Sequence, residues 1–314
     1  MIVMTVLFAL LSLAGVVAAV APRLLSRTEW QDREPVLALW VWQCAVAAVL
    51  LACVLAMALS AAAAWHAVRG QLFAFAPHGV EDAYGFGEFG PWSAMCAVLL
   101  ALGAARTAAM LTLEVRVERA RRRRHRAELL TRAPKLPGEE RGRERLVVLE
   151  SERADAWWLP GTPPRLVITT AALRRLKGRR LDAVLAHEQD HARARHHWLQ
   201  HCAGALATGF PQVPVFAAFR DQVHRLVELA ADDAASRRHG RLTTALALVE
   251  LNADRGVFGP CPTHHAQLPR RVDRLLDPKP RFSRARRLRL TALAVLIPVV
   301  PVLVTLVPGL HAMA

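Results

Sequence analysis

The stretch Leu181–His191, LDAVLAHEQDH, carries two histidines four residues apart, with a glutamate directly after the first. On an α-helix, residues four apart lie one turn above each other, so His187 and His191 can present two imidazole nitrogens to a single ion. Glu188 then lies on a neighbouring flank of the helix. Two histidines that bind Zn²⁺ beside a glutamate that takes a proton from water are typical of a zinc hydrolase. With 13 histidines in the chain, the motif can also arise by chance, so its surroundings must decide.

The surroundings favour a helix, because Leu181–Leu206 contains no proline and only one glycine. The apolar residues that recur at helical spacing on one side are Leu181, Val184, Leu185, Trp198, Leu199, Cys202 and Leu206. Glu188 and His191 lie on that same side and His187 at its edge, whereas His196 points away. A charged glutamate and a histidine on an apolar face cost free energy unless they are paired or bind a metal. The alternative is a solvated helix with scattered histidines.

A catalytic zinc needs a third protein ligand and an open position for water. One candidate is His197, which stands where enzymes with the longer motif HExxHxxGxxH place theirs. The glycine that would turn the chain is replaced here by Ala194, and on a continuous helix His197 points away from His191. We therefore reject His197 as the third ligand.

A better candidate lies in VELAADDAA, residues 227–235, where Glu228 and Asp232 are four apart on a second expected helix. The flanking alanines are small enough to let this helix pack closely against the first. Glu228 can act as the ligand, and Asp232 can accept the second ring N–H of a ligand histidine, which fixes its tautomer. His224 shares this face, either as a ligand or polar lining or as a surface histidine. Asp233 is expected to be solvated.

With these residues in place, the chain resembles the gluzincin membrane metallopeptidases. The resemblance rests on HExxH followed by ExxxD, on LPGTPPRLVITTAALRRL before them and on THHAQLPRRVDRLL after them. This group includes the heat-shock and CAAX-prenyl proteases and, closer in layout, the beta-lactam-sensor (antirepressor) metallopeptidases of bacteria. The similarity runs from about Leu146 to Leu276, and the layout of apolar segments extends it over most of the chain.

The resemblance implies one Zn²⁺ per chain and assigns a role to several residues. The implied zinc ligands are His187, His191 and Glu228. Glu188 is the implied general base. His265 and Arg271 match an H…R pattern that holds substrate or an oxyanion in the family, although the usual proline after the histidine is Ala266 here. A reading of His265 and Arg271 as surface polar residues is equally open.

The composition predicts a membrane protein, because 54% hydrophobic residues and a net charge of +15 must be segregated along the chain. Four apolar runs are each near or above the ~20 residues that span a bilayer. They cover about residues 2–20, 36–64, 92–113 and 290–310. The first run could instead be a signal peptide, but no basic residue precedes Arg23, which favours a retained helix.

The placement of arginine predicts the orientation of these spans. The clusters RVERARRRRHR and RFSRARRLR follow the third span and precede the fourth, and the second loop carries only Arg69. All basic clusters share one side if the N-terminus lies outside, so the segment between Glu114 and Arg289 is expected in the cytoplasm of a bacterium. Arg106, inside the third span, is expected to face protein or to reach towards the interface.

The fold predicted from these patterns is a mainly α membrane protein with an α+β, zincin-like metallopeptidase domain inserted before its last span. Residues 1–113 hold three transmembrane helices, 114–145 a basic linker, 146–287 the metallopeptidase domain, and 288–314 the fourth transmembrane helix and a short tail. RLVVLE and RLVITT, from Arg145 and Arg165, are expected strands of a small sheet, one edge of which could bind extended substrate. Residues 203–219 either form a hairpin that dips into the membrane or belong to a buried core.

These features lead us to expect a membrane-embedded zinc metalloendopeptidase, in regulatory proteolysis or in the quality control of membrane proteins. Its expected partners are a protein or peptide substrate, with a transcriptional repressor as one candidate, and the lipid bilayer. The alternative is a non-catalytic receptor or scaffold with a degenerate metal site. Direct binding of nucleic acid is not expected, because the arginine run adjoins a membrane span, where topology and anionic lipid account for it.

Overall fold

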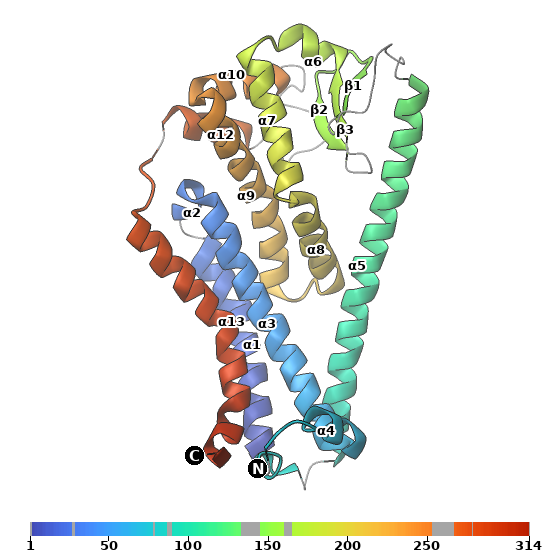
Figure 1. Cartoon of the computed structure of the whole chain (residues 1–314), viewed down its shortest axis with the longest axis vertical. Coiled ribbons are helices and arrows are strands. Elements are labelled where there is room, and N and C mark those ends of the chain that lie inside the picture. The colour runs from blue at the N-terminus through green and yellow to red at the C-terminus, as the bar shows by residue number, and fades with distance from the viewer. Residues whose placement is uncertain are drawn as a thin grey trace.

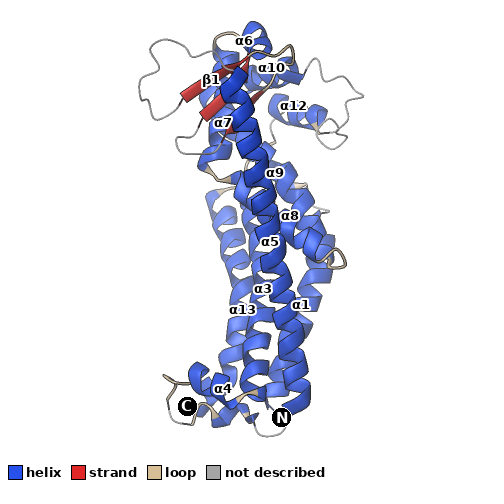
Figure 2. Ribbon diagram, turned by 90° about the vertical axis from the view of Figure 1, so that its right-hand side faces the viewer, coloured by secondary structure: helices blue, strands red, loops and turns tan. Residues whose placement is uncertain are grey.

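The protein is an elongated, mostly helical molecule with a small sheet at one end (Figure 1). The computed structural model describes residues 2–26, 29–77, 79–86, 90–132, 145–159, 165–252, 267–277 and 279–313. Long helices form a bundle over most of its length, and the sheet and several shorter helices lie beyond one end of that bundle (Figure 2). The short elements of the bundle and its loops are α2 (Trp30–Arg33), α4 (His66–Leu72) and the 3-10 turn η1 (Asp82–Tyr84).

Four helices are long and apolar enough to cross a membrane, which agrees with the four predicted spans and indicates a multi-pass membrane protein. They are α1 (Ile2–Ser26), α3 (Pro35–Ala64), α5 (Gly90–Arg132) and α13 (Arg284–Met313). Within α5, the apolar part is Pro91–Val117. The four helices share α3 as their centre, since α1, α5 and α13 all pack against it.

Small residues let the neighbouring helices approach α3 closely. Ala38, Ala52 and Ala56 of α3 are fully buried, and their Cβ atoms leave the backbones room to meet. Because lipid tails are as apolar as the helices, close packing of this kind contributes more to association in a membrane than hydrophobic burial does.

The sheet has three strands, β1 (Arg145–Leu149), β2 (Ala156–Leu159) and β3 (Arg165–Thr169), in the order β1-β3-β2. β1 runs parallel to β3 with Val147 opposite Val167, and β2 runs antiparallel to it with Ala156 opposite Ile168. The two β-branched runs predicted as strands are therefore confirmed, while β2 was not foreseen. The short helix α6 (Thr170–Arg175) follows β3, and the side chain of Thr169 accepts a hydrogen bond from the backbone of Ala172 to cap it.

The third span continues as a helix far beyond its apolar part. The sequence predicts a linker from residue 114, whereas α5 runs on to Arg132. The run that follows Val117 consists mainly of arginine, alanine, glutamate and leucine, which favour helix and include neither proline nor glycine. Residues 133–144, which hold the later part of the expected linker, lie outside the described residues.

The helix that carries the HExxH motif ends earlier than its sequence suggests. A continuous helix from Leu181 to Leu206 was predicted, but α7 (Arg179–Arg193) and α8 (His196–Gly209) are separate helices. Arg195 between them has φ of 52°, the only positive φ outside glycine among the described residues. Because L-residues resist this left-handed conformation, contacts made by α8 with α5 and α9 (Pro214–His239) must hold the turn.

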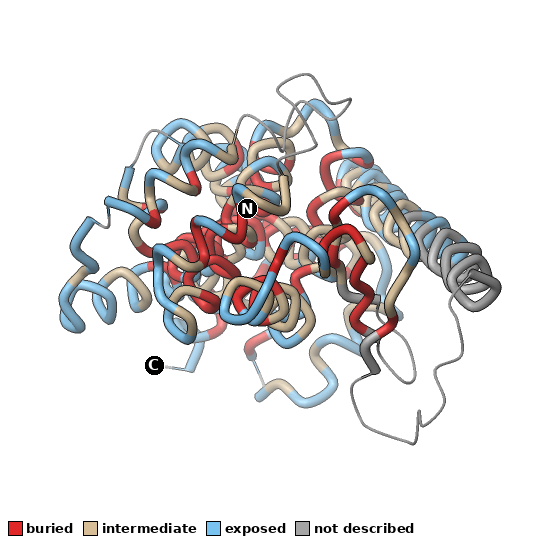
Figure 3. Tube along the Cα trace, turned by 90° about the horizontal axis from the view of Figure 1, so that it is seen from above, coloured by how far each residue is buried: buried red, intermediate tan, exposed pale blue. Residues whose placement is uncertain are grey.

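The hairpin between α8 and α9 is buried against the candidate spans, so residues 203–219 form part of a buried core. Leu206, Phe216 and Phe219 are buried in one apolar cluster with residues of α1 and α3. Arg106 of the third span donates a hydrogen bond from Nε to the carbonyl oxygen of Gly209 at the hairpin (2.6 Å). Its charge therefore faces protein, as expected. Seen from above, the buried stretches gather in the middle of the molecule (Figure 3).

Candidate metal centre

The candidate metal centre lies where α7 and α9 pack side by side beyond the end of the bundle (Figure 1). α7 begins after Gly178, whose φ of 54° suits glycine, and its face with Ala183 and Val184 packs against the sheet and α6. α9 is rich in buried alanines around its acidic residues, which lets α7 come close. Each helix thus contributes polar side chains one turn apart to a shared interface.

Three potential ligand atoms converge at this interface, one each from His187, His191 and Glu228. The Nε2 atoms of His187 and His191 are 3.1 Å apart. The Glu228 carboxylate oxygens lie 3.6 Å from His187 Nε2 and 3.5 Å from His191 Nε2. Zinc–ligand bonds of about 2.0–2.1 Å place tetrahedral ligands roughly 3.3–3.4 Å apart. The two nitrogens are about one such edge apart, and each has a Glu228 oxygen at a similar distance, Oε2 for His187 and Oε1 for His191. With one atom from each residue, all three lie within 4.8 Å of one another, so the donor set fits zinc.

The two other histidines weighed as ligands are not part of this cluster. Among the described residues, no further group of three metal-binding side chains converges in this way. His197 lies on α8, and His224 of α9 contacts the side chain of Gln200 on α8 (3.4 Å). The rejection of His197 therefore stands, and His224 is an exposed histidine, which agrees with the surface alternative. His265 lies outside the described residues.

Asp232 lies directly behind the first histidine, as its spacing predicted. Its carboxylate is fully buried, and Oδ1 lies 3.1 Å from His187 Nδ1. This is an ion-pair distance, although the ring nitrogen is not aligned for a hydrogen bond. Because Nδ1 faces Asp232, the opposite nitrogen, Nε2, is turned towards Glu228 and His191.

Arg271, on α12 (Leu268–Leu276), joins the two carboxylates of α9. Its guanidinium donates to both oxygens of Asp232 (2.8 and 2.7 Å) and to Glu228 Oε2 (2.9 Å). Only 9% of its surface is exposed. The sequence suggested that Arg271 holds substrate or an oxyanion, or else lies on the surface. The surface reading is wrong, because packing of α12 against α9 and α10 (Arg241–Asn252) buries the side chain.

The charges of the cluster decide its protonation. Burial would raise the pKa of Glu228, but His187 and Arg271 outweigh it and hold that pKa well below its usual range. Burial likewise would lower the pKa of His187, yet its contacts with Asp232 and Glu228 raise it. For His191, burial and the neighbouring His187 together lower the pKa. A metal cation that binds here therefore finds Glu228 ionised and His191 neutral. Its binding to His187 displaces a proton from that ring.

His196 is a member of the site that sequence reasoning missed. It was expected to point away from the motif, but its Nδ1 lies 2.9 Å from His191 Nδ1, and only 5% of its surface is exposed. The helix breaks at Arg195 after α7 ends, and this break brings the first residue of α8 beside His191. The contact between His196 and His191 could not be predicted from helical spacing, because that prediction treats residues 181–206 as one unbroken helix.

We expect His196→Ala to weaken zinc binding by about 10- to 100-fold, because its contact fixes the ring of a metal-binding histidine. The dissociation constant can be measured by competition with a chromophoric chelator. His197→Ala, which changes the adjacent histidine, should leave that constant within about twofold, and His196→Asn should restore part of the loss by hydrogen bonding to His191. Equal losses in the two alanine variants would remove His196 from the site.

Glu188 lies in the cleft beside these groups. A cavity of about 190 Å³ is lined by Glu188 together with His187, Glu228 and Arg271. The rest of its lining is mainly apolar. It comprises Ala247, Leu248 and Leu251 of α10, Leu268 of α12, Ala156 of β2, Ala183 and Val184 of α7, and the polar residues Asp155, Thr244 and Asn252. Glu188, two of the three candidate ligands (His187 and Glu228) and the edge strand β2 therefore line one small space.

A comparison with protein families matches residues 117–289 to peptidase family M48. The chain belongs to peptidase family M48. The match covers more than half of the sequence and includes α7, α9 and α12, which carry the cluster. It confirms the resemblance to the gluzincin metallopeptidases and identifies the chain as a metallopeptidase, and the three converging ligands fit the metal that such enzymes use. No curated protein and no solved structure is matched by the M48 chain.

One further expectation about the M48 site is wrong. Asp233 was expected to be solvated, but it is buried and forms ion pairs with Arg274 and Arg281 (both 2.8 Å). Arg274 lies on α12 and Arg281 just before α13. The spacing of residues along the sequence does not predict where these segments lie relative to α9.

Proposed function

We propose that this M48 protein is a zinc metalloendopeptidase that binds one Zn²⁺ through His187, His191 and Glu228 and cleaves peptide bonds close to the membrane surface. The observation that carries the proposal is the convergence of one ligand atom each from His187, His191 and Glu228, all within 4.8 Å of one another, beside a cleft that Glu188 lines. A structural metal site would need the ligands but not a second carboxylate beside them.

The chemistry divides between the ion and the protein. A bound zinc ion lowers the pKa of a water molecule and polarises a carbonyl group. Glu188, as general base, accepts the proton of the attacking water and then delivers it to the leaving amine. Asp232 and His196 hold the two imidazole rings in place, and Arg271 balances the charge of Asp232 and Glu228.

The active site is proposed to face the cytoplasm of a bacterial cell. The arginine-rich continuation of α5 and the arginine-rich start of α13 both adjoin the metallopeptidase part of the chain. The positive-inside preference places such clusters in the cytoplasm. β2 lies at the edge of the sheet and begins in the wall of the cleft. Its backbone could bind an extended substrate through main-chain hydrogen bonds, which do not depend on the substrate's sequence. A repressor or a segment of a membrane protein is a candidate substrate.

A non-catalytic receptor with a degenerate metal site is the second candidate, and the complete set of ligands with Glu188 beside them argues against it. The two are separated by removing the metal. We expect 1,10-phenanthroline to abolish cleavage of a casein-like substrate by the full chain in lipid nanodiscs, and added zinc to restore it. Cleavage that persists in the chelator, or no cleavage with zinc present, would refute the proposal.

A further inference from the structure

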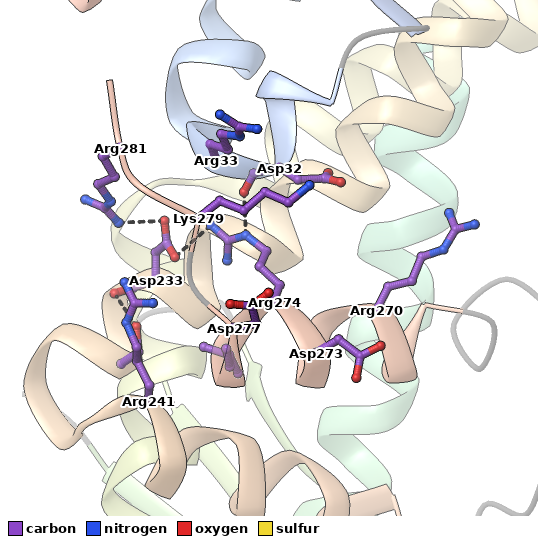
Figure 4. A pocket seen from close by; sticks show the side chains of 12 residues that line it. Asp32, Arg33, Asp233, Arg241, Arg270, Asp273, Arg274, Asp277, Lys279 and Arg281 are labelled. Atoms are coloured by element: carbon purple, nitrogen blue, oxygen red, sulfur yellow. Dashed lines mark hydrogen bonds and ion pairs between the residues drawn. The ribbon is translucent and has the colours of Figure 1, made fainter. Parts of the chain in front are cut away.

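A second cavity, of about 310 Å³, shares no lining residue with the cleft at the metal site (Figure 4). It lies among α2, the end of α9, the start of α10, α12 and the segment that leads into α13. Its lining is strongly charged. The basic residues are Arg33, Arg241, Arg270, Arg274, Lys279 and Arg281, and the acidic residues are Asp32, Asp233, Asp273 and Asp277. Cations outnumber carboxylates by six to four.

Part of this charge is already paired. Asp233 binds both Arg274 and Arg281, and Lys279 pairs with Glu29 (3.1 Å). Asp32 is held by Arg225 of α9, and its backbone oxygen accepts a hydrogen bond from Arg274. These pairs tie α2, α9, α12 and the start of α13 into one frame around the cavity.

Three cations of the lining, Arg33, Arg241 and Arg270, form no such ion pair within the described part of the chain. The Nε atom of Arg33 is buried without a hydrogen-bond partner, which costs free energy unless a ligand or solvent satisfies it. Arg270 is exposed on α12 and makes no ion pair with a described residue. In Figure 4 they lie on different sides of the cavity, Arg33 on α2 and Arg270 on α12. Guanidinium groups of this kind suit phosphate, because their forked N–H groups bind its oxygens in pairs.

The cavity also lies at the level where the membrane surface is expected. α2 connects the end of α1 to the start of α3, and α13 begins three residues after Arg281. The exposed arginines at the start of α13, Arg284, Arg286, Arg287 and Arg289, lie next in the chain. Anionic headgroups collect against basic segments at this depth of a membrane. A free phosphate ion would not require a site at this depth.

From the unpaired cations and this location we propose that the cavity binds the phosphate-bearing headgroup of an anionic phospholipid, held by Arg33 and Arg270. At about 310 Å³, the cavity has the size of a small ligand pocket. Asp233 and Arg270 in its wall directly adjoin Asp232 and Arg271 of the metal centre, so a bound headgroup would steady α9 and α12. That consequence rests on the proposed peptidase function, whereas binding of the lipid does not.

The test is native mass spectrometry of the delipidated full-length chain in mild detergent, titrated with phosphatidylglycerol, phosphatidylcholine or glycerol 3-phosphate. We expect one phosphatidylglycerol per chain to bind saturably, and Arg33→Gln with Arg270→Gln to weaken it about tenfold or more, because two charge-assisted contacts are lost. The control pair Arg284→Gln with Arg289→Gln removes the same charge at the same end of the spans but leaves the cavity lining intact. It should bind within about twofold of wild type.

Equal weakening in both double variants would mean general attraction to a basic surface and would overturn the proposal. Equal binding of phosphatidylcholine, or saturable binding of glycerol 3-phosphate without the lipid, would overturn it as well. Because a loss could also follow from misfolding, the melting temperature of each variant should match that of wild type. Arg270→Gln alone changes an exposed side chain and should still weaken binding severalfold. A chain that binds the lipid but cleaves nothing would refute the peptidase function and leave this site standing.

Discussion

Glu188→Gln is expected to reduce peptide-bond hydrolysis by about 10²- to 10⁴-fold, the range that a positioned general acid or base contributes. Glutamine has nearly the shape of glutamate but cannot accept the proton of the attacking water. Glu188 is not one of the three converging ligands, so zinc content should not change. The loss should therefore fall on kcat, measured with a fluorogenic protein substrate and the full chain in nanodiscs.

The matched control is Asp182→Asn, which makes the same chemical change on an exposed side chain of the same helix. We expect its kcat to stay within about twofold of wild type, because Asp182 does not line the cleft. Wild-type activity in Glu188→Gln would remove that residue from the mechanism. Loss of zinc from Glu188→Gln would instead show that Glu188 contributes to zinc binding.

Arg271→Met is expected to lower the free energy of unfolding of the metal-free protein by about 3 kcal/mol or more. The variant leaves Glu228 and Asp232 buried without their cation, and breaking a buried pair by removal of one partner typically costs about 3–5 kcal/mol. Zinc should restore part of this loss, because ligand that binds only the folded state stabilises it by mass action. Chemical denaturation in detergent, with and without zinc, measures both effects.

Two further variants make the result specific to the buried contact. Arg271→Lys keeps the charge but loses the forked geometry that reaches both carboxylates, so its loss should be intermediate. Arg270→Gln changes the exposed neighbour on α12 and should change stability by no more than about 0.5 kcal/mol. An Arg271→Met chain as stable as wild type would show that the carboxylates do not depend on the guanidinium.

Much of the architecture follows from local sequence patterns. The four spans are readable because a bilayer demands about 20 apolar residues in a row, and the histidine pair and Glu228 with Asp232 are readable because helical geometry fixes residues four apart. β1 and β3 are readable from their β-branched runs. In each case the sequence pattern that predicts the element lies within the element itself. Contacts with neighbouring elements are not needed to predict it.

The rest depends on contacts between distant segments. His196 reaches His191 only because α7 stops and Arg195 turns left-handed, and α8 is held there by α5 and α9. Arg271 and Asp233 are buried because α12 and the segment just before α13 fold back onto α9. Helix propensity and apolar spacing describe one helix at a time, so they cannot place these partners.

The decisive measurement is the zinc content of the purified full-length chain, determined by elemental analysis after dialysis and compared with that of His187→Ala and Glu228→Ala. Two imidazole nitrogens and a carboxylate oxygen that converge within 4.8 Å predict one zinc per wild-type chain and a fraction of that in either variant. Wild-type protein without stoichiometric zinc, or variants that retain it in full, would contradict the metal centre on which the proposed peptidase depends.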